Sequence, residues 1–322
     1  MANDFYTADQ VSQVALRLVE EDQYLSALVS RDIVDPLKGG GAGRTISLAI
    51  PNALVARDRD IDDKETELVY DELAEARITT TAGSAAYSGV SLSDGDLSLD
   101  LSDFSRQVLA KQVDAVVEKI ENAVATSLLS IPLNTDVAWD SAHPERTFTQ
   151  IRKILRKRGV PQTGIRCVVG VDVYAALLDA DLLVDASSSG STAALREGNI
   201  GRIRGFDIVE STRVSDGDIA VFHKDALSFS VRAPLAAAGQ FAATATGNGY
   251  SLRYTRGFDM SNAETKSLLD TMYAIVKLPM YKITRDESTH KATATQLAAG
   301  EDATFRMSIS DAEPAADDGG EV

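Results

Sequence analysis

One interior segment of the chain, residues 52–89, is too polar to pack against a core of its own. It opens with a dense acidic stretch and ends in a run of small residues at 83–86. Interior segments of this length and polarity are uncommon in compact domains and are usually functional or disordered. As an extended hairpin, each leg of ~18 residues would span about 60 Å. Such an arm needs a neighbouring molecule to lie on. Its acidic residues are Asp58, Asp60, Asp62, Asp63, Glu65, Glu67, Asp71, Glu72 and Glu75.

The residues before this segment predict an N-terminal helix followed by a flexible joint. Apolar residues at i, i+3 and i+4 spacing predict a helix over 8–31, with Thr7 or Asp9 as its cap. The glycine-rich run 39–43 indicates a joint, and the alternating residues of 44–51 predict a strand.

A strand over 90–101 and then a long helix over 103–130, capped by Asp103, are predicted after the polar segment. The helix has a continuous apolar stripe, which requires a surface to cover it. The stripe consists of Phe104, Val108, Leu109, Val113, Val116, Val117, Ile120, Val124 and Leu128.

From Thr147 the pattern predicts a compact α/β unit. The apolar run 167–171 predicts a strand covered on both faces. Helices are expected at 147–158 and 172–178, a flexible loop at 187–192, and an Ala/Gly-rich crossing at 236–249. Strands are expected at 206–209, 219–222, 227–231, 250–258 and 270–278, with two or three more in 281–310 before an acidic, disordered end at 311–322.

The charge of the chain argues against a protein that grips nucleic acid. Asp and Glu number 48 against 32 Lys and Arg, for a formal net charge of -16. Phosphate binding draws on clustered cations. The one dense basic run, within 152–158, is interpreted as a solvated or salt-bridging helix face. Net negative charge suits the wall of a container, because a wall that bound DNA tightly would resist filling.

The sequence shows no membrane span and no signal peptide. The single cysteine, Cys167, cannot form an internal disulfide, which fits a reducing compartment.

Searches for a catalytic, cofactor or metal site find none. The glycine run 39–43 lacks the Gly-Lys-Ser/Thr of a phosphate loop. Asp58-x-Asp60-x-Asp62 opens like a calcium loop, but Asp63 and Val69 occupy the positions that need Gly and Glu. His143, His223 and His290 have no partner at metal-ligand spacing, and Cys167 lies in an apolar strand, where cysteine acts as a small hydrophobe. We therefore expect no enzyme and no cofactor.

Several segments, in order, resemble major capsid proteins of tailed double-stranded DNA phages with the Hong Kong 97-type shell fold. The first, 201–211 (GRIRGFDIVES), continues through 220–227 (AVFHKDAL) to 231–234 (VRAP). It is similar to a family pattern of a Gly-x-x-x-Gly-Phe strand followed by a strand that ends in His-x-Asp/Glu-Ala. Residues 249–253, 258–259 and 270–273 look like the family's return strands, and 103–109 (DFSRQVL) looks like the start of its spine helix.

The resemblance implies an α+β fold with the parts of a Hong Kong 97-type capsid subunit. These are an N-terminal arm (1–43), an extended loop (44–97), a peripheral domain with a long spine helix (98–146 and 240–282), an axial domain (147–239), and a C-terminal extension with an acidic tail (283–322).

The implied function is a structural subunit that assembles in the host cytoplasm into an icosahedral virion head. Its partners would be further copies in hexamers and pentamers, a separate scaffolding protein, a portal protein, an optional decoration protein, and packaged double-stranded DNA bound without sequence specificity, with no membrane. No crosslink is expected, because Lys64 is the one lysine of the loop and no partner set for it can be assigned. Expected inter-subunit contacts are Arg57, Asp58, Arg59, Asp60, Glu65, Glu67, Leu18 and Leu25.

Three alternatives remain open at this point. An encapsulin-type nanocompartment shell protein would share the shell fold and house an enzyme. A soluble enzyme on an unrelated scaffold would form a small oligomer with a deep pocket. A virion accessory protein would bind shells that have already formed.

Overall fold

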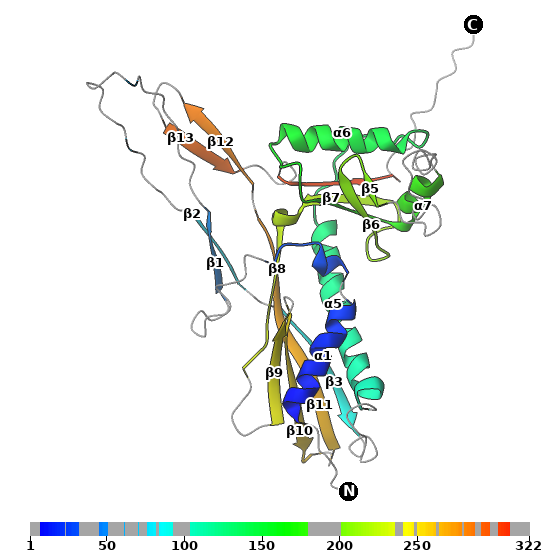
Figure 1. Ribbon diagram of the computed structural model, residues 1–322, viewed down its shortest axis with the longest axis vertical. Helices are drawn as coiled ribbons and strands as arrows, with labels where there is room; N and C mark the ends of the chain where they lie inside the picture. Colours follow the sequence, from blue (N-terminus) through cyan, green and yellow to red (C-terminus); the bar gives the residue numbers. More distant parts are fainter. Residues whose placement is uncertain are drawn as a thin grey trace. The chain divides into compact units, whose positions relative to one another are not determined.

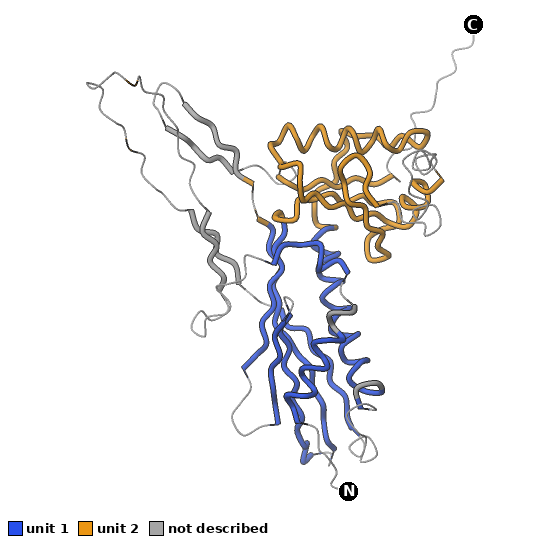
Figure 2. Tube along the Cα trace, viewed as in Figure 1, with its two compact units in different colours: residues 1–46, 80–128, 227–277 blue, residues 47–79, 129–226, 278–322 orange. Residues whose placement is uncertain are grey.

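The chain divides into two units, which are described separately (Figure 2). Unit 1 comprises residues 1–46, 80–128 and 227–277, and unit 2 comprises residues 47–79, 129–226 and 278–322. The computed structural model describes residues 7–22, 24–31, 45–50, 61, 70, 76–81, 84–92, 104–179, 201–235, 241–247, 250–261, 264–278, 280–286, 291–296 and 302–309.

Unit 1 is built on an antiparallel five-stranded sheet (Figure 1). The strand order is β3 (Ser84–Leu92), β11 (Glu264–Lys277), β10 (Tyr250–Asp259) and β9 (Phe241–Gly247), and β8 (Leu227–Arg232) also pairs with β11. The register sets Tyr254 opposite Leu269 on β11, and both side chains are fully buried. Strand β9 falls in the stretch expected to be an Ala/Gly-rich crossing. That prediction was wrong because β9 pairs along its whole length with β10, the next strand in the sequence. The Asn-Gly dipeptide at 248–249 is a hairpin signal, and the Ala/Gly content of the stretch hid it.

The long helix begins at Phe104, makes a π-helical turn over Ser105–Leu109, and continues as α5 (Ala110–Leu129). All nine residues of the predicted apolar stripe are buried, so the prediction of this helix is confirmed. The helix is also fixed to the sheet by a hydrogen-bonded amide. The Gln112 side-chain amide donates to the carbonyls of Ser88 and Ser267, and its oxygen accepts from the Ser267 hydroxyl.

The N-terminal helix α1 (Ala8–Asp22) is shorter than predicted. Thr7 and Gln10 form a reciprocal cap, in which each backbone N–H donates to the other's side chain, so Thr7 acts as predicted. The predicted helix to residue 31 was wrong, because the chain leaves α1 and forms a 3-10 turn at Leu25–Ala27. Ser30 then bonds the backbone of Leu227 and Phe229, which joins the segment to the start of β8.

Aromatic rings fill the core of unit 1. Phe104 and Phe241 both meet the edge of Tyr254, with ring centroids 6.4 Å and 6.5 Å away. Phe229 lies 5.7 Å from Tyr250 in the same way. Edge and tilted contacts at these separations are the favoured arrangements of aromatic pairs. They connect the long helix with three consecutive strands, β8, β9 and β10, that lie far from it in the sequence.

Among the residues that the structure describes, unit 2 is a five-stranded mixed sheet with two α-helices (Figure 1). The order is β14 (Thr304–Ser308), β7 (Asp218–His223), β4 (Ile165–Val169), β6 (Phe206–Glu210) and β5 (Arg202–Ile203), and only β4 and β6 run parallel. Residues 167–169 of central β4 are fully buried, as the apolar run predicted. Helix α6 (Pro144–Lys157) packs Phe148 against Phe206, and α7 (Val171–Asp179) follows β4 directly.

Arg306 on β14 ties the end of the sequence into unit 2. Its guanidinium binds the Asp218 carboxylate at 2.7 Å and also donates to the carbonyls of Leu129 and Ile131. Leu129 ends α5, so the arginine satisfies a carbonyl that a helix end leaves without a partner. Thus part of the expected C-terminal extension is a strand of the unit 2 sheet.

Two smaller pairs of strands complete the described structure. β1 (Thr45–Ile50) pairs with β2 (Ala76–Thr81), and β12 (Tyr281–Asp286) pairs with β13 (Lys291–Gln296). The strand predicted over 44–51 and the strands predicted within 281–310 are confirmed. β2 lies inside the predicted arm of 52–89 rather than at its end, and residues 84–89 belong to β3, which pairs with β11 of unit 1, so the arm was predicted too long. The loop 187–192, the Asp103 cap and the tail 311–322 lie outside the described residues.

The boundaries of the two units differ from the domain limits expected from the resemblance. Strand β8 pairs with β11 and belongs to unit 1, although it was expected in the axial domain. Residues 129–146 belong to unit 2 rather than with the long helix. The first difference arises because β8 pairs with β11, a contact that is non-local in the sequence.

Candidate assembly surfaces

The predicted contacts of the acidic arm lie outside the described residues, and they stay a prediction. Within 51–75 the structure describes only Ile61 and Tyr70, whose side chains are 96% and 84% exposed. The predicted residues are Arg57, Asp58, Arg59, Asp60, Glu65 and Glu67.

The two apolar residues predicted as contacts differ in burial. Helix α1 packs on β9 and β10 of its own unit, so most of its apolar face is already covered. Leu25 is fully buried there and has no surface left for a neighbouring subunit to contact. Leu25 was assigned to an interface because the apolar stripe of the predicted helix needed a partner surface, and its burial within unit 1 removes that reason. Leu18 is half-buried and stays a predicted contact.

A buried carboxylate fixes the segment that follows α1. Glu121 on α5 is 1% exposed, and its oxygens accept the backbone N–H groups of Leu25 at 2.6 Å and of Ser26 at 3.2 Å, with Tyr24 at 3.4 Å. These contacts satisfy N–H groups of a turn that is largely shut off from water. The sequence offered a signal for this residue, since Glu121 stands at an apolar-stripe position of α5.

Polar and cationic groups link the turn bound by Glu121 to the aromatic core of unit 1. The Ser26 hydroxyl and the Tyr250 hydroxyl are hydrogen-bonded at 2.7 Å. The Arg31 guanidinium lies 5.1 Å from the centre of the Tyr250 ring. Burial lowers the pKa of Arg31, while Tyr250 and Glu121 act to raise it. For Tyr250 the effect of burial has the opposite sign: it raises the pKa to about 12, so the phenol stays neutral. The network holds residues 24–31 against the long helix and β10.

Cys167 and His223, the one conceivable nucleophile pair, are not arranged for catalysis. Cys167 is fully buried and burial raises the pKa of its thiol, so the reactive thiolate is disfavoured. On β7, His223 stands opposite Ile165 rather than Cys167. Its Nε2 lies 2.9 Å from the Thr163 carbonyl, and its Nδ1 accepts from the Asp225 N–H. Both ring nitrogens therefore serve the turns at the end of the sheet.

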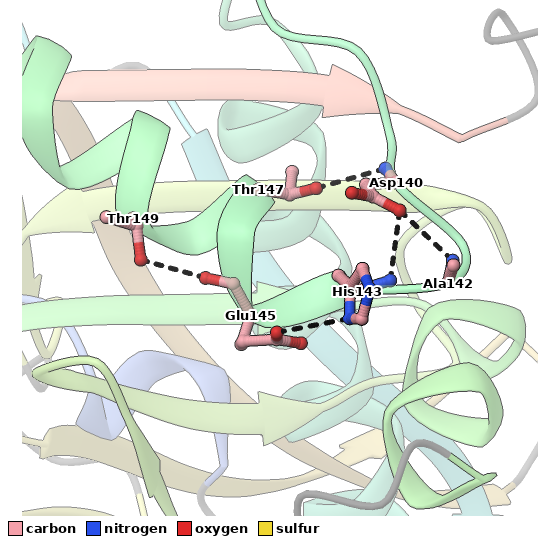
Figure 3. Close-up of polar contacts among 6 residues, drawn as sticks. All are labelled: Asp140, Ala142, His143, Glu145, Thr147 and Thr149. Carbon is pink, nitrogen blue, oxygen red and sulfur yellow. Dashed lines mark hydrogen bonds and ion pairs between the residues drawn. The ribbon is translucent and has the colours of Figure 1, made fainter.

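His143 likewise belongs to local structure, at the start of α6 (Figure 3). Asp140 accepts the N–H groups of Ala142 and His143 at 3.1 Å and 2.9 Å, which fixes the turn into the helix. The imidazole Nδ1 lies 3.6 Å from Glu145, an exposed pair of small energetic worth. His290 lies outside the described residues.

Across the described ranges, no His, Cys, Asp and Glu side chains gather in a group that could hold a metal ion. No described helix is long and apolar enough to span a bilayer.

Large apolar side chains are exposed at the turn between β10 and β11. Phe258 is 62% exposed and Met260 is 89% exposed. Between them, Asp259 is bound at 2.5 Å by Lys266, and this hydrogen bond lowers the pKa of the carboxyl. Tyr87, on the edge strand β3, is 73% exposed. None of these residues was among the predicted contacts.

Helix α6 carries a second exposed feature, which is purely basic. The run within 152–158 forms part of its solvent side, and Arg146 lies on the same side one to two turns earlier. The interpretation of this run as a solvated helix face therefore holds for its exposed residues. What the sequence could not show is that Arg204, in the turn between β5 and β6, lies against this helix: Arg152 donates to the Arg204 carbonyl.

Comparison with known proteins finds likeness in structure alone. The sequence matches no family model and no curated protein. Among solved structures, a chain described as Mycobacterium phage Che8 is similar with a TM-score of 0.54 at 17% identity, covering 79% of this chain and 87% of that chain. A chain from the asymmetric unit of the bacteriophage PhiM1 mature capsid gives a TM-score of 0.52 at 14% identity, covering 89% and 87%.

These likenesses establish the fold. The chain has the α+β Hong Kong 97-type fold of phage major capsid proteins, as the sequence resemblance predicted. The long helix α5 corresponds to the expected spine helix.

Proposed function

We propose that this protein is the major capsid protein of a tailed double-stranded DNA phage, a structural subunit and not an enzyme. The observation that carries the proposal is the fold: a chain of the PhiM1 mature capsid matches this one over 89% of its length. Copies would associate into hexamers and pentamers and close into an icosahedral head. Head-to-tail contacts that repeat around an axis close into rings of this kind.

Surface features of the chain support a role in assembly. Phe258, Met260 and Tyr87 leave large apolar groups in water, at positions where a neighbour could cover them. The acidic arm, with its predicted contacts Arg57, Asp58, Arg59, Asp60, Glu65 and Glu67, would reach over a neighbouring subunit. Charged contacts of this type set register and partner choice more than affinity.

The proposed partners follow from the task of building and filling a head. A separate scaffolding protein would direct closure, a portal protein would occupy one vertex, and a decoration protein could bind the finished shell. The packaged DNA would be enclosed without sequence-specific contacts, which suits a chain with a net charge of -16. Assembly would take place in the host cytoplasm, and the product would be the virion capsid.

Sedimentation velocity combined with electron microscopy tests the proposal. The protein is produced alone and together with the product of its upstream neighbouring gene. Closed particles tens of nanometres across, in either condition, are expected. A small monodisperse oligomer in both conditions would contradict the proposal. If particles form around a cargo enzyme encoded beside the gene, the shell is a nanocompartment rather than a phage head.

A further inference from the structure

The solvent side of α6 carries charge of one sign only. Its exposed positions recur at helical spacing, and the two uncharged ones are Thr149 and Gln150. Every charged residue among them is basic, in a chain with an excess of acidic residues. These residues are Arg146, Lys153, Arg156 and Lys157.

None of these four cations pairs with a carboxylate among the residues that the structure describes. Arg156 donates to the Val160 carbonyl at 2.6 Å, and that contact holds the turn after the helix. The arginine ion pairs described in unit 2 lie elsewhere, on Asp207 and Asp218. Four like charges on one helix face repel one another and favour binding of an anion.

Arg204 extends this surface beyond the helix. Its carbonyl accepts a hydrogen bond from the Arg152 guanidinium, which also lies against Gly205. The side chain of Arg204 is exposed. The basic face, defined here as Arg146, Lys153, Arg156, Lys157 and Arg204, therefore combines a helix with the turn between β5 and β6.

The backbone of Arg204 is strained to make this turn. Ile203 pairs with Phe206, so Arg204 and Gly205 form a two-residue hairpin loop. Both have positive φ, 48° and 94°, and Arg204 is the one non-glycine residue with positive φ in the described part of the chain. Loops of this kind favour Asn or Gly at the first position, because other side chains clash with the backbone there. An arginine kept at such a position suggests that its side chain has a function.

We propose that the basic face binds the acidic segment, residues 58–75, of a neighbouring copy. The inference rests on the proposed shell function and names the surface that receives the arm. The acidic segment has nine carboxylates and only two basic residues, so its charge complements that of the basic face. Each subunit of a ring supplies one basic face and one acidic segment, so the two are matched in number.

A carboxylate partner fits the whole chain better than DNA does. The net charge of -16 opposes the approach of a polyanion as dense as duplex DNA. The acidic segment is part of the subunit, so once a ring forms its local concentration at the basic face is high. Contacts between exposed charges are individually weak and screened by salt, which allows subunits to exchange until the register is correct.

The test reverses charge on each side and then combines the two changes. One variant carries Lys153→Glu with Lys157→Glu, and a second carries Asp58→Lys with Asp60→Lys. Each is produced under the conditions in which the unaltered protein forms particles, and the two are also produced together. Particle yield is measured by sedimentation and electron microscopy. A third variant, Lys111→Glu with Lys119→Glu, makes the same charge change at exposed positions of α5 and serves as the control.

Each single-sided variant should give about tenfold fewer particles, because repulsion replaces attraction at every contact. Co-production should restore most of the yield, since alternating variants make every contact of a hexamer complementary and all but one of a pentamer. The control should assemble normally. All variants must keep the folded circular dichroism spectrum.

Three outcomes would overturn the inference. Normal assembly by the Lys153 and Lys157 variant would show that the face is not an interface. Rescue only when all four changes are on one chain would show that the segment binds its own subunit. Normal assembly with a loss of DNA retention in a gel shift would make the face a phosphate contact. Failure of the unaltered protein to form particles would instead refute the proposed shell function.

Discussion

Replacing Glu121 with alanine tests how the N-terminal segment is held. The carboxylate accepts N–H groups of Tyr24, Leu25 and Ser26, and Leu25 and Ser26 are fully buried. Hydrogen bonds to a charged group are worth about 1.5–3 kcal/mol each, and buried donors left without partners cost a similar amount. Because Tyr24 is 46% exposed and can bind water, only two of the three donors are stranded. We therefore expect Glu121→Ala to destabilise unit 1 by ~3–5 kcal/mol.

Amide hydrogen exchange on the purified protein is the appropriate assay, since a chain with two units need not unfold in one step. Protection of the Leu25 and Ser26 amides should fall by more than 100-fold, with ~2.8 kcal/mol corresponding to about two powers of ten. Urea unfolding of unit 1 should shift in the same direction. Glu121→Gln keeps one acceptor oxygen and should have an intermediate effect.

Glu118→Ala is the matched control, because Glu118 is an exposed residue of the same helix. It should change the free energy of unfolding by less than about 0.5 kcal/mol. If Glu121→Ala left both the exchange of residues 24–26 and the unfolding transition at their original values, the carboxylate would not be the anchor described here.

Three further predictions concern unit 2 and the core of unit 1. Arg306→Ala should destabilise unit 2 by ~3–5 kcal/mol in urea unfolding, because it leaves the buried Asp218 carboxylate without its partner. The control Arg202→Ala removes an exposed ion pair and should cost under ~1 kcal/mol. Equal effects of the two substitutions would contradict the argument. Gly170→Ala should lower stability by about 3 kcal/mol, because its Cβ would meet the Ser215 carbonyl at 2.2 Å, while Gly257→Ala, with open space around it, should be close to neutral. The folded-state pKa of Tyr250, about 12, lies above the unfolded value of 10.0, so its contribution to stability is complete below pH 10 and is lost as the pH rises toward 12. Ultraviolet titration should show at least one tyrosine ionising late, and normal ionisation of all tyrosines near pH 10 would contradict this.

The elements whose apolar residues follow a regular local pattern were predicted correctly from the sequence. The apolar stripe of α5 and the unbroken apolar run of β4 each have one arrangement that buries them, and the structure has both. The stripe of α1 seemed to continue through Leu28 and Val29, but Glu121, about 95 residues away in sequence, captures the N–H groups of the turn instead. Sequence periodicity carries no information on a hydrogen bond of that range.

Strand pairing explains the remaining differences, locally for β9 and over a long range for β14. Strand β9 has a weak pattern of small residues and exists because β10 pairs with it. Strand β14 joins β7 across about 80 residues, which placed the end of the chain in unit 2 rather than in a separate extension. In both cases the partner strand, and not the strand's own composition, determines the structure.

The two candidate assembly surfaces also differ in how far the sequence alone reveals them. The acidic arm could be proposed from composition, because a dense run of carboxylates requires no tertiary information to recognise. The basic face could be recognised only in part. Residues 152–158 reveal a cluster of cations, but the cluster includes Arg152 and Arg158, which donate to backbone carbonyls within unit 2, alongside the exposed Lys153 and Lys157. Only the structure separates cations that stabilise the subunit from those left for a partner.

That separation bears on how a shell of such subunits could remain specific. The ion pairs inside the units, such as Arg306 with Asp218 and Arg253 with Asp270, are shielded from solvent and respond little to salt. The charges of the basic face are exposed, so salt should weaken the proposed contact without loosening the subunit fold. Particle yield should therefore decrease as the ionic strength is raised, while the unfolding transition of the subunit stays nearly constant. If the two declined together with salt, the stability of the subunit itself, and not a contact between subunits, would limit assembly.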